Sequence, residues 1–189
     1  MCEVFRRANG AVVLDADGLN ALAEFRGGDA NPLVANGSDC KRPAMIVTPH
    51  PGEMARLRAA AGMPELKGDD DETRLRVAHE YAIRSGATVV LKGHRTVVCT
   101  SDRAYINTTG NPGMATGGMG DVLTGLIAAL LGQGLEPFDA GRLAAHVHGA
   151  AADLCARRVG PVGYLARDVA EHIPPALAQV ISAPIGFGQ

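Results

Sequence analysis

The sequence lacks the features that mark metal-bound, disulfide-bonded and membrane-spanning proteins. No CxxC pair and no histidine cluster at zinc-ligand spacing occurs in it, and its four cysteines are scattered. They are Cys2, Cys40, Cys99 and Cys155. This distribution favours free thiols in a reducing cytoplasm over a zinc site or a disulfide framework. The longest apolar stretch, from Val122 to Leu131, is interrupted by Thr124 and Gly125 and is far too short to cross a bilayer.

An excess of charge of either sign is also missing. The 18 basic and 20 acidic residues give a formal net charge of −2, which argues against broad binding to nucleic acid or to an anionic membrane. The first seven residues, MCEVFRR, lack the apolar region of a signal peptide. We therefore expect a cytoplasmic protein with no nucleic-acid or membrane partner.

What the chain does have is the composition of one globular domain. Hydrophobic residues make up 47% of its 189 residues and charged residues 20%, so it can bury a sizeable core. It shows no internal repeat, low-complexity tract or linker. We expect a single domain over residues 1–189.

Short apolar runs alternate with helix-forming segments along the chain. The runs at 11–16, 44–48 and 87–93 predict buried parallel strands, and 94–107 predicts two further short strands. Segments after each run predict helices, one of them starting near Glu53 and a well-marked one ending at Gly86. From Gly118 the chain is predicted to be helical, with a last segment that Pro174-Pro175 interrupts.

This alternation predicts an α/β fold with a mainly parallel sheet. In such folds, ligands bind beyond the carboxyl ends of the strands. That rule directs attention to residues 15–17, 48–50 and 92–93. Lysine is an unusual end for a buried strand, so Lys92 is either a surface lysine with a buried stem or a ligand contact.

Residues 110–125, GNPGMATGGMGDVLTG, form a glycine-rich loop that leads into an apolar helix. Glycines let the backbone approach a phosphate closely, and free N–H groups at a helix N-terminus bind anions. The loop is not a Walker A motif, because no Lys-Ser/Thr pair follows its last glycine, and it does not match the Rossmann GxGxxG spacing. Asp121 is then either a helix cap or a base that accepts a proton as a hydroxyl attacks phosphorus.

An ordered set of motifs resembles the ADP-dependent NAD(P)H-hydrate dehydratases, which are ribokinase-like enzymes. These motifs are VVLDADGLNAL (12–22), TPHPGEMARL (48–57), VVLKGHRTVV (89–98) and NPGMATGGMGDVLTGLIAALLGQG (111–134). The resemblance covers about residues 10–181 and implies a three-layer α/β sandwich. It further implies that a nucleotide phosphorylates the ring hydroxyl of hydrated NADH or NADPH (NADHX or NADPHX). Phosphate then leaves and restores the double bond, because phosphate is a far better leaving group than hydroxide.

The same resemblance implies roles for individual residues. Asp121 would contact the hydrate and act as the base, and Gly117–Gly120 would form the anion hole. The implied nucleotide-binding residues are Lys92, Gly93, His94, Arg95, Thr96, Gly117, Gly118, Met119 and Gly120. ADP is the implied phosphoryl donor, with Mg²⁺ to neutralise phosphate charge. No residue is identified as a metal ligand.

The corner His50-Pro51-Gly52-Glu53 is where the family places its substrate. A lone histidine between prolines is usually structural, and Glu53 is also explained as an acid favoured by the helix dipole. The alternative is that His50 and Glu53 bind substrate and that Glu53 helps to organise magnesium and phosphate. His146 and His148 lie two positions apart on a predicted helix and so on different faces, which favours packing over a metal pair.

The family's domain begins well upstream of the first strand of this chain, so we expect an N-terminally truncated domain. Two alternatives to the dehydratase therefore stay open. One is a small-molecule kinase of the same superfamily, and the other is a nucleotide-binding remnant without activity. The resemblance also implies an epimerase partner, as a domain or a separate protein, and a homo-oligomer.

Overall fold

The computed structural model describes residue 8, residues 10–24 and residues 43–182. Five strands of this part form one sheet, in the spatial order β1 (Val12–Leu14), β2 (Met45–Val47), β3 (Thr88–Leu91), β4 (Val97–Cys99) and β5 (Ala104–Ile106). The first three strands are parallel, whereas β4 and β5 pair antiparallel. The strands lie within the apolar runs that predicted them.

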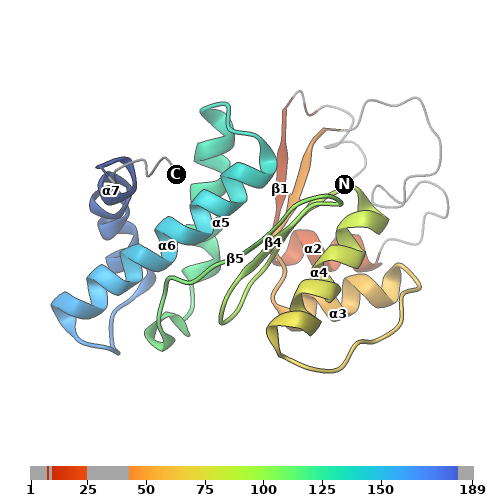
Figure 1. Ribbon diagram of the computed structural model, residues 1–189, viewed down its shortest axis with the longest axis horizontal. Helices are drawn as coiled ribbons and strands as arrows, with labels where there is room; N and C mark the ends of the chain where they lie inside the picture. The colour runs from red at the N-terminus through yellow and green to blue at the C-terminus, as the bar shows by residue number, and fades with distance from the viewer. Residues whose placement is uncertain (1–7, 9, 25–42, 183–189) are drawn as a thin grey trace, which may run out of the picture.

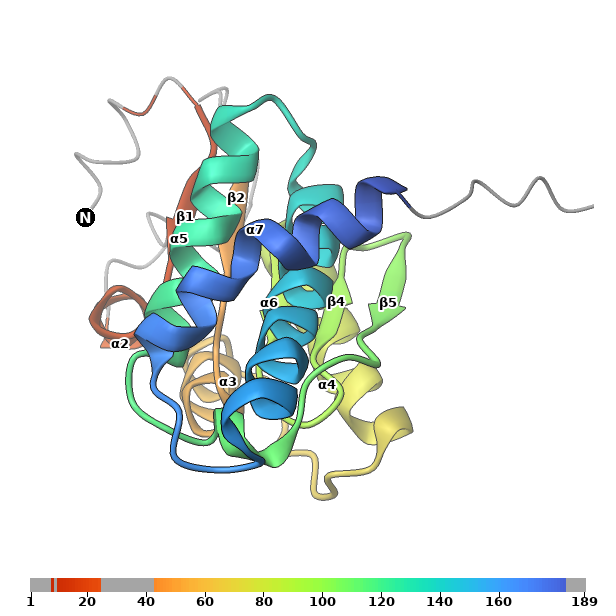
Figure 2. The same ribbon diagram turned by 90° about the vertical axis from the view of Figure 1, so that its left-hand side faces the viewer.

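Helices cover both faces of the sheet (Figure 1). They are α2 (Asp17–Glu24), α3 (Pro51–Ala60), α4 (Asp71–Ser85), α5 (Met119–Gly132), α6 (Pro137–Val159) and α7 (Ala166–Ser182). The helices α2, α3 and α4 pack on one face, and α5 and α6 pack on the other. The helix α7 lies across α5 and α6 on the outside (Figure 2). The predicted three-layer α/β sandwich is therefore confirmed.

Strand β3 shows how one run of apolar residues holds the layers together. Its side chains alternate between faces, so that Val89 and Leu91 belong to the core beneath α3 and α4. Val90 belongs to the core beneath α5 and α6, where it lies with Ile127. A strand buried on both faces needs this continuous apolar sequence, which is why no polar alternation appears in it.

The predicted helix ends are found where side-chain chemistry requires them. Asp70 caps α4, its carboxylate accepting a hydrogen bond from the Thr73 backbone N–H. Gly86 ends the same helix in the left-handed conformation, with φ of 68°. The helix α3 begins earlier than predicted, at Pro51 rather than near Glu53, because His50 is its N-cap and Pro51 takes the first helical position.

The prediction that Pro174-Pro175 interrupts the last helix is wrong. The helix α7 runs through both prolines, which are exposed and lack the N–H groups of two helical hydrogen bonds. The loss is offset by packing, because Val169 and Ala176 are fully buried against α6 and Ile173 packs beside them. Tertiary burial thus outweighs a local rule.

The structure also describes the helices and two of the cysteines with respect to membrane spanning and thiol state. None of the helices within residues 10–24 and 43–182 is long and apolar enough to span a bilayer. Cys99 and Cys155 are free and buried, and burial raises the pKa of the Cys99 thiol to about 11. Cys2 and Cys40 lie outside the described residues.

Candidate active site and nucleotide cavity

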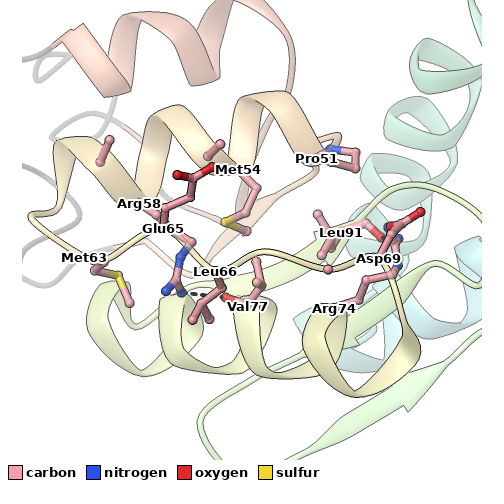
Figure 3. Close-up of a pocket in the computed structure, with 13 residues that line it drawn as sticks. Pro51, Met54, Arg58, Met63, Glu65, Leu66, Asp69, Arg74, Val77 and Leu91 are labelled. Atoms are coloured by element: carbon pink, nitrogen blue, oxygen red, sulfur yellow. Dashed lines mark hydrogen bonds and ion pairs between the residues drawn. The ribbon is translucent and has the colours of Figure 1, made fainter.

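A cavity of about 320 Å³ lies between α3, α4 and the loop that joins them. Figure 3 shows Met54, Met63, Leu66 and Val77 around it, together with two arginines. Both guanidinium groups already donate hydrogen bonds to backbone carbonyls. We call it the smaller cavity, to distinguish it from one of about 500 Å³ that is described below. None of the residues predicted to bind nucleotide or substrate lines it.

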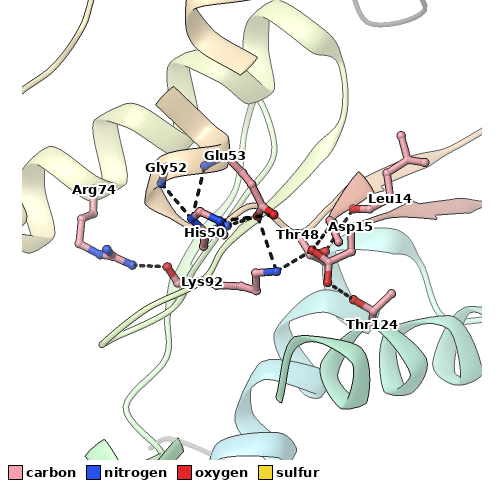
Figure 4. Close-up of polar contacts among 10 residues, drawn as sticks. Leu14, Asp15, Thr48, His50, Gly52, Glu53, Arg74, Lys92 and Thr124 are labelled. Atoms are coloured by element: carbon pink, nitrogen blue, oxygen red, sulfur yellow. Dashed lines mark hydrogen bonds and ion pairs between the residues drawn. The ribbon is translucent and has the colours of Figure 1, made fainter. Parts of the chain in front are cut away.

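The segments that follow β1, β2 and β3 meet around the Lys92 side chain (Figure 4). This is the edge of the sheet where ligands bind in α/β folds. The Lys92 ammonium lies 2.5 Å from Asp15 Oδ1 and 3.8 Å from Glu53 Oε2. The Lys92 backbone N–H donates to the Pro49 carbonyl at 2.8 Å, which ties the end of β3 to the corner after β2. Three strand ends therefore form one charged cluster.

Asp15 is the centre of this charged cluster. Its carboxylate accepts hydrogen bonds from Lys92, from the Thr124 hydroxyl at 2.9 Å and from the Ala16 backbone N–H at 2.9 Å. Burial alone would raise the pKa of Asp15, but the hydrogen bond and charge of Lys92, helped by Thr124, hold that pKa below its ordinary value. Asp15 stays ionised and fixes the position of the lysine.

Asp15 and Thr124 were not among the predicted site residues. The signal for Asp15 was present, since an acid directly follows a buried strand in LDAD, but residues 15–17 were noted only as a strand end. Thr124 gave no signal, because it lies inside an apolar helix and reaches Asp15 only through the fold.

The corner after β2 is a capping box. His50 Nδ1 accepts hydrogen bonds from the backbone N–H groups of Gly52 and Glu53, and the His50 backbone N–H donates to the Glu53 carboxylate at 2.7 Å. Since Nδ1 is an acceptor, the neutral ring carries its proton on Nε2, which lies 3.5 Å from Glu53 Oε1. Both residues thus have the structural role foreseen for them, and their contact with substrate stays a prediction.

The glycine loop ends at Gly118, whose φ of 85° requires the left-handed conformation. Within the described residues, no side chain caps the start of α5. The N-terminal N–H groups of this helix therefore lack the side-chain acceptor that serves α3 and α4. Asp121 lies in the first turn of α5 and is exposed.

A second, larger cavity of about 500 Å³ lies beside this helix start. Its lining brings together two segments that the sequence predicted to bind nucleotide: Lys92, Gly93, His94, Arg95, Thr96, Met119 and Gly120. Gly117 and Gly118 are exposed and are not among the lining residues. Gly120 lies where the cavity and the charged cluster meet, because a Cβ at this position would be 3.3 Å from both Asp15 Oδ2 and Lys92 Nζ.

A further wall of this cavity is built from the segment 107–111 and from α6. Asn107 donates to the Ala145 carbonyl at 3.2 Å, and Thr109 donates to the His146 carbonyl at 2.8 Å. Asp153 of α6 accepts hydrogen bonds from the Gly110 backbone and the Asn111 side chain, each at 2.9 Å. These contacts fix a polar loop to a helix that was predicted only as packing, so sequence reasoning missed this wall.

His148 also belongs to this wall. It is 6% exposed, and its Nε2 atom has no hydrogen-bond partner within the described part of the chain. Burial lowers the pKa of His148 to about 4, so the ring is neutral at physiological pH. The back of the larger cavity is therefore uncharged, in contrast to its edge at Lys92.

No group of three or more His, Cys, Asp or Glu side chains that could hold a metal ion occurs among residues 10–24 and 43–182. A metal ion at the charged cluster would therefore complete its coordination with phosphate and water oxygens, which suits Mg²⁺. The residues present fit a nucleotide better than a metal alone, because backbone N–H groups and a lysine meet at a cavity of suitable size.

Comparison with known proteins gives consistent results. The sequence profile of a family described as NAD(P)H-hydrate dehydratase matches residues 1–175. The chain is 46% identical over 179 residues to a bifunctional NAD(P)H-hydrate repair enzyme of Moorella thermoacetica, an alignment that covers 93% of this chain and 31% of that protein. It is 43% identical over 164 residues to an ADP-dependent (S)-NAD(P)H-hydrate dehydratase of Neisseria meningitidis, which covers 84% of this chain and 50% of that one.

Two solved structures resemble the fold. The crystal structure of an ADP/ATP-dependent NAD(P)H-hydrate dehydratase from Bacillus subtilis, co-crystallised with ATP and Mg²⁺, has a TM-score of 0.70 at 31% identity and covers 91% of this chain and 56% of that one. A ribokinase-like superfamily protein from Enterococcus faecalis has a TM-score of 0.63 at 27% identity, covering 88% and 52%. The ribokinase-like fold is thereby confirmed. The chain spans about a third of the length of the Moorella relative and about half of that of the Neisseria relative.

Proposed function

Because this chain belongs to the NAD(P)H-hydrate dehydratase family, we propose that it removes water from NADHX and NADPHX with ADP as the phosphoryl donor. The observation that carries this proposal is the larger cavity, which the turn at 92–96 and the start of α5 line together. Two segments predicted separately to bind one nucleotide thus face the same space, next to the charged cluster.

The phosphates of ADP would lie at the junction of the two segments. The uncapped N-terminal N–H groups of α5 and the Lys92 ammonium are donors for phosphate oxygens. The neutral wall at Asn107 and His148 would face the nucleoside part. The Neisseria relative is an ADP-dependent dehydratase, which supports ADP as the donor.

Asp121 would act as the base in the first step. Its carboxylate takes the proton of the ring hydroxyl while the hydroxyl oxygen attacks the terminal phosphorus of ADP, and AMP leaves. Loss of phosphate from the ring then restores the double bond, so that hydrate and ADP give NADH or NADPH, AMP and phosphate. Asp121 is exposed in the first turn of α5, so its carboxylate is accessible to a substrate hydroxyl.

Mg²⁺ is proposed to accompany the nucleotide. Asp15 and Glu53 are the carboxylates of the charged cluster that would hold it, directly or through water. When bound, Mg²⁺ neutralises phosphate charge. The ATP and Mg²⁺ of the Bacillus subtilis co-crystal support this part of the proposal.

The substrate side is proposed to include His50 and Glu53, whose corner lies beside Lys92. The bifunctional name of the Moorella relative supports a partner activity, which we propose is an epimerase acting on the same hydrates. Assembly into a homo-oligomer stays a prediction.

The experiment is a measurement of absorbance at 340 nm after the chain is mixed with hydrated NADH, ADP and Mg²⁺. The proposal requires a rise that depends on ADP and is matched by release of AMP and phosphate. A phosphorylated hydrate without NADH would identify a kinase instead. ADP binding by a folded protein without any product would identify a nucleotide-binding protein and reject the dehydratase.

A further inference from the structure

Arg74, on the first turn of α4, is a buried charge that contacts the back of the turn at 92–96. The residue is only 5% exposed, and its guanidinium donates to the carbonyls of Leu91 and Lys92 at 3.4 and 3.2 Å. Figure 4 shows the contact with Lys92, on the side away from the charged cluster. Arg74 was absent from every prediction made from the sequence.

The turn that Arg74 contacts has an unusual backbone. Gly93 has φ of 142°, and Arg95 has φ of 55°, which is uncommon for a residue other than glycine. A backbone held in such conformations persists only where its surroundings fix it. The guanidinium packs directly against this glycine, since a Cβ on Gly93 would come within 2.8 Å of it.

A second contact joins the same two segments. Arg95 Nε lies 2.8 Å from Asp71 Oδ2, so the turn also reaches back to the start of α4. Asp69, just before that helix, pairs with Arg74 at 3.0 Å. Two arginines therefore connect the start of α4 with the turn. Arg74 reaches from the helix to the turn, and Arg95 reaches from the turn to the helix.

Arg58 of α3 provides an internal comparison for Arg74 (Figure 3). It is 3% exposed, donates to the carbonyls of Val77 and Pro64, and pairs with Glu80 at 2.9 Å. Both arginines line the smaller cavity, and neither has a partner for its Nε atom among the described residues. They differ in their backbone partners, because only Arg74 binds a carbonyl of the predicted nucleotide turn, that of Lys92.

We propose that Arg74 is a positioning residue for the nucleoside diphosphate, holding the turn at 92–96 in the shape that presents Lys92 and the Gly93 backbone to the phosphates. The inference rests on the proposed function, because it takes this turn to be part of the nucleotide site. Arg74 itself lies behind the turn and acts through it.

The experiment compares Arg74→Met with Arg58→Met in the full chain. Each substitution removes one buried guanidinium of similar exposure, so both lower stability by the same mechanism. We expect Arg74→Met to weaken ADP binding, measured by calorimetry, at least about tenfold, as for a lost hydrogen bond to a charged group. Arg58→Met should leave ADP affinity within about twofold, because its partners are remote from the turn.

Two further readouts separate positioning from general damage. In the turnover assay, Arg74→Met should raise the KM for ADP while kcat at saturating ADP is largely kept. Hydrogen exchange of the nucleotide-free protein should accelerate at residues 92–96 in Arg74→Met and not in Arg58→Met. Arg74→Lys, which keeps the charge and most of the stem but not the fork, should fall between wild type and Arg74→Met and covers the case in which Arg74→Met does not fold.

Equal losses of ADP affinity in the two methionine variants would overturn the inference, since they would reflect stability alone. Unchanged affinity in Arg74→Met would overturn it as well. If the wild-type chain itself fails to bind ADP, the proposed function is rejected. The exchange rates at residues 92–96 then still decide whether Arg74 holds the turn.

Discussion

The smaller and the larger cavity described above are both partly apolar and lined by basic residues, but the hydrogen bonding of their polar groups differs. In the smaller one, under α3 and α4, the guanidinium groups of Arg58 and Arg74 are committed to backbone carbonyls. In the larger one, backbone N–H groups at the start of α5 have no side-chain cap from residues 10–24 or 43–182. Polar groups that still lack a hydrogen-bond partner, rather than volume, therefore mark the larger cavity as the binding site.

The largest expected effect concerns chemistry next to the larger cavity. Asp121→Asn keeps the shape of the side chain and removes its basicity, so turnover should fall about 10²- to 10⁴-fold. The measurement is the rate of NADH formation at 340 nm, with ADP affinity measured in parallel. Affinity should stay close to that of the wild type, and an active Asp121→Asn enzyme would assign the base to another residue.

The neutral wall of the larger cavity gives a pH-dependent stability. The pKa of His148 is lowered by burial to about 4 in the folded chain, whereas an unfolded histidine titrates near pH 6.5. Below pH 6.5 the unfolded chain therefore binds a proton that the folded chain does not, and stability falls as the pH drops toward 4. Titration of His148 should lower the free energy of unfolding by up to about 3 kcal/mol over this range.

Urea unfolding at several pH values between 7 and 4 measures this loss. His148→Gln should flatten the dependence over this window, because it removes the group that titrates. A slope that is the same in His148→Gln and in the wild type would show that the histidine is not buried as described.

Lys92 should matter for binding more than any lysine near the smaller cavity. Lys92→Met removes a donor for phosphate and leaves the Asp15 carboxylate without its partner, so ADP affinity should fall about 10- to 100-fold. Calorimetric titration with ADP measures it. Lys67→Met, at an exposed position in the loop beside the smaller cavity, is the matched control and should bind ADP like the wild type.

The smallest expected effect comes from replacing one methionine in each cavity. Met63 lines the smaller cavity and Met114 lines the larger one. Replacing either methionine by leucine should cost less than about 1.5 kcal/mol of stability. Only Met114→Leu is expected to change ADP affinity measurably. A large change of ADP affinity in Met63→Leu would show that the smaller cavity is coupled to nucleotide binding. The two cavities would then not differ in function.

Much of the fold could be predicted from local sequence. Apolar runs such as 87–93 predicted strands, because a strand buried on both faces admits few polar residues. Gly86 marked the C-terminal end of α4, because such an end depends on residues within one turn. The passage of α7 through Pro174-Pro175 could not be predicted, because it depends on burial against α6.

The sequence by itself determined the α/β class, the glycine loop before α5 and the family to which the motifs point, since each depends on residues close together in the chain. Only the tertiary structure decided that Lys92 meets Asp15, 77 residues away, and that Thr124 meets the same carboxylate across 109 residues. The order of the strands places these side chains at one edge of the sheet. Contacts of this kind arise from packing, for which a sequence carries no local signal, and the same holds for Arg74 behind the turn at 92–96.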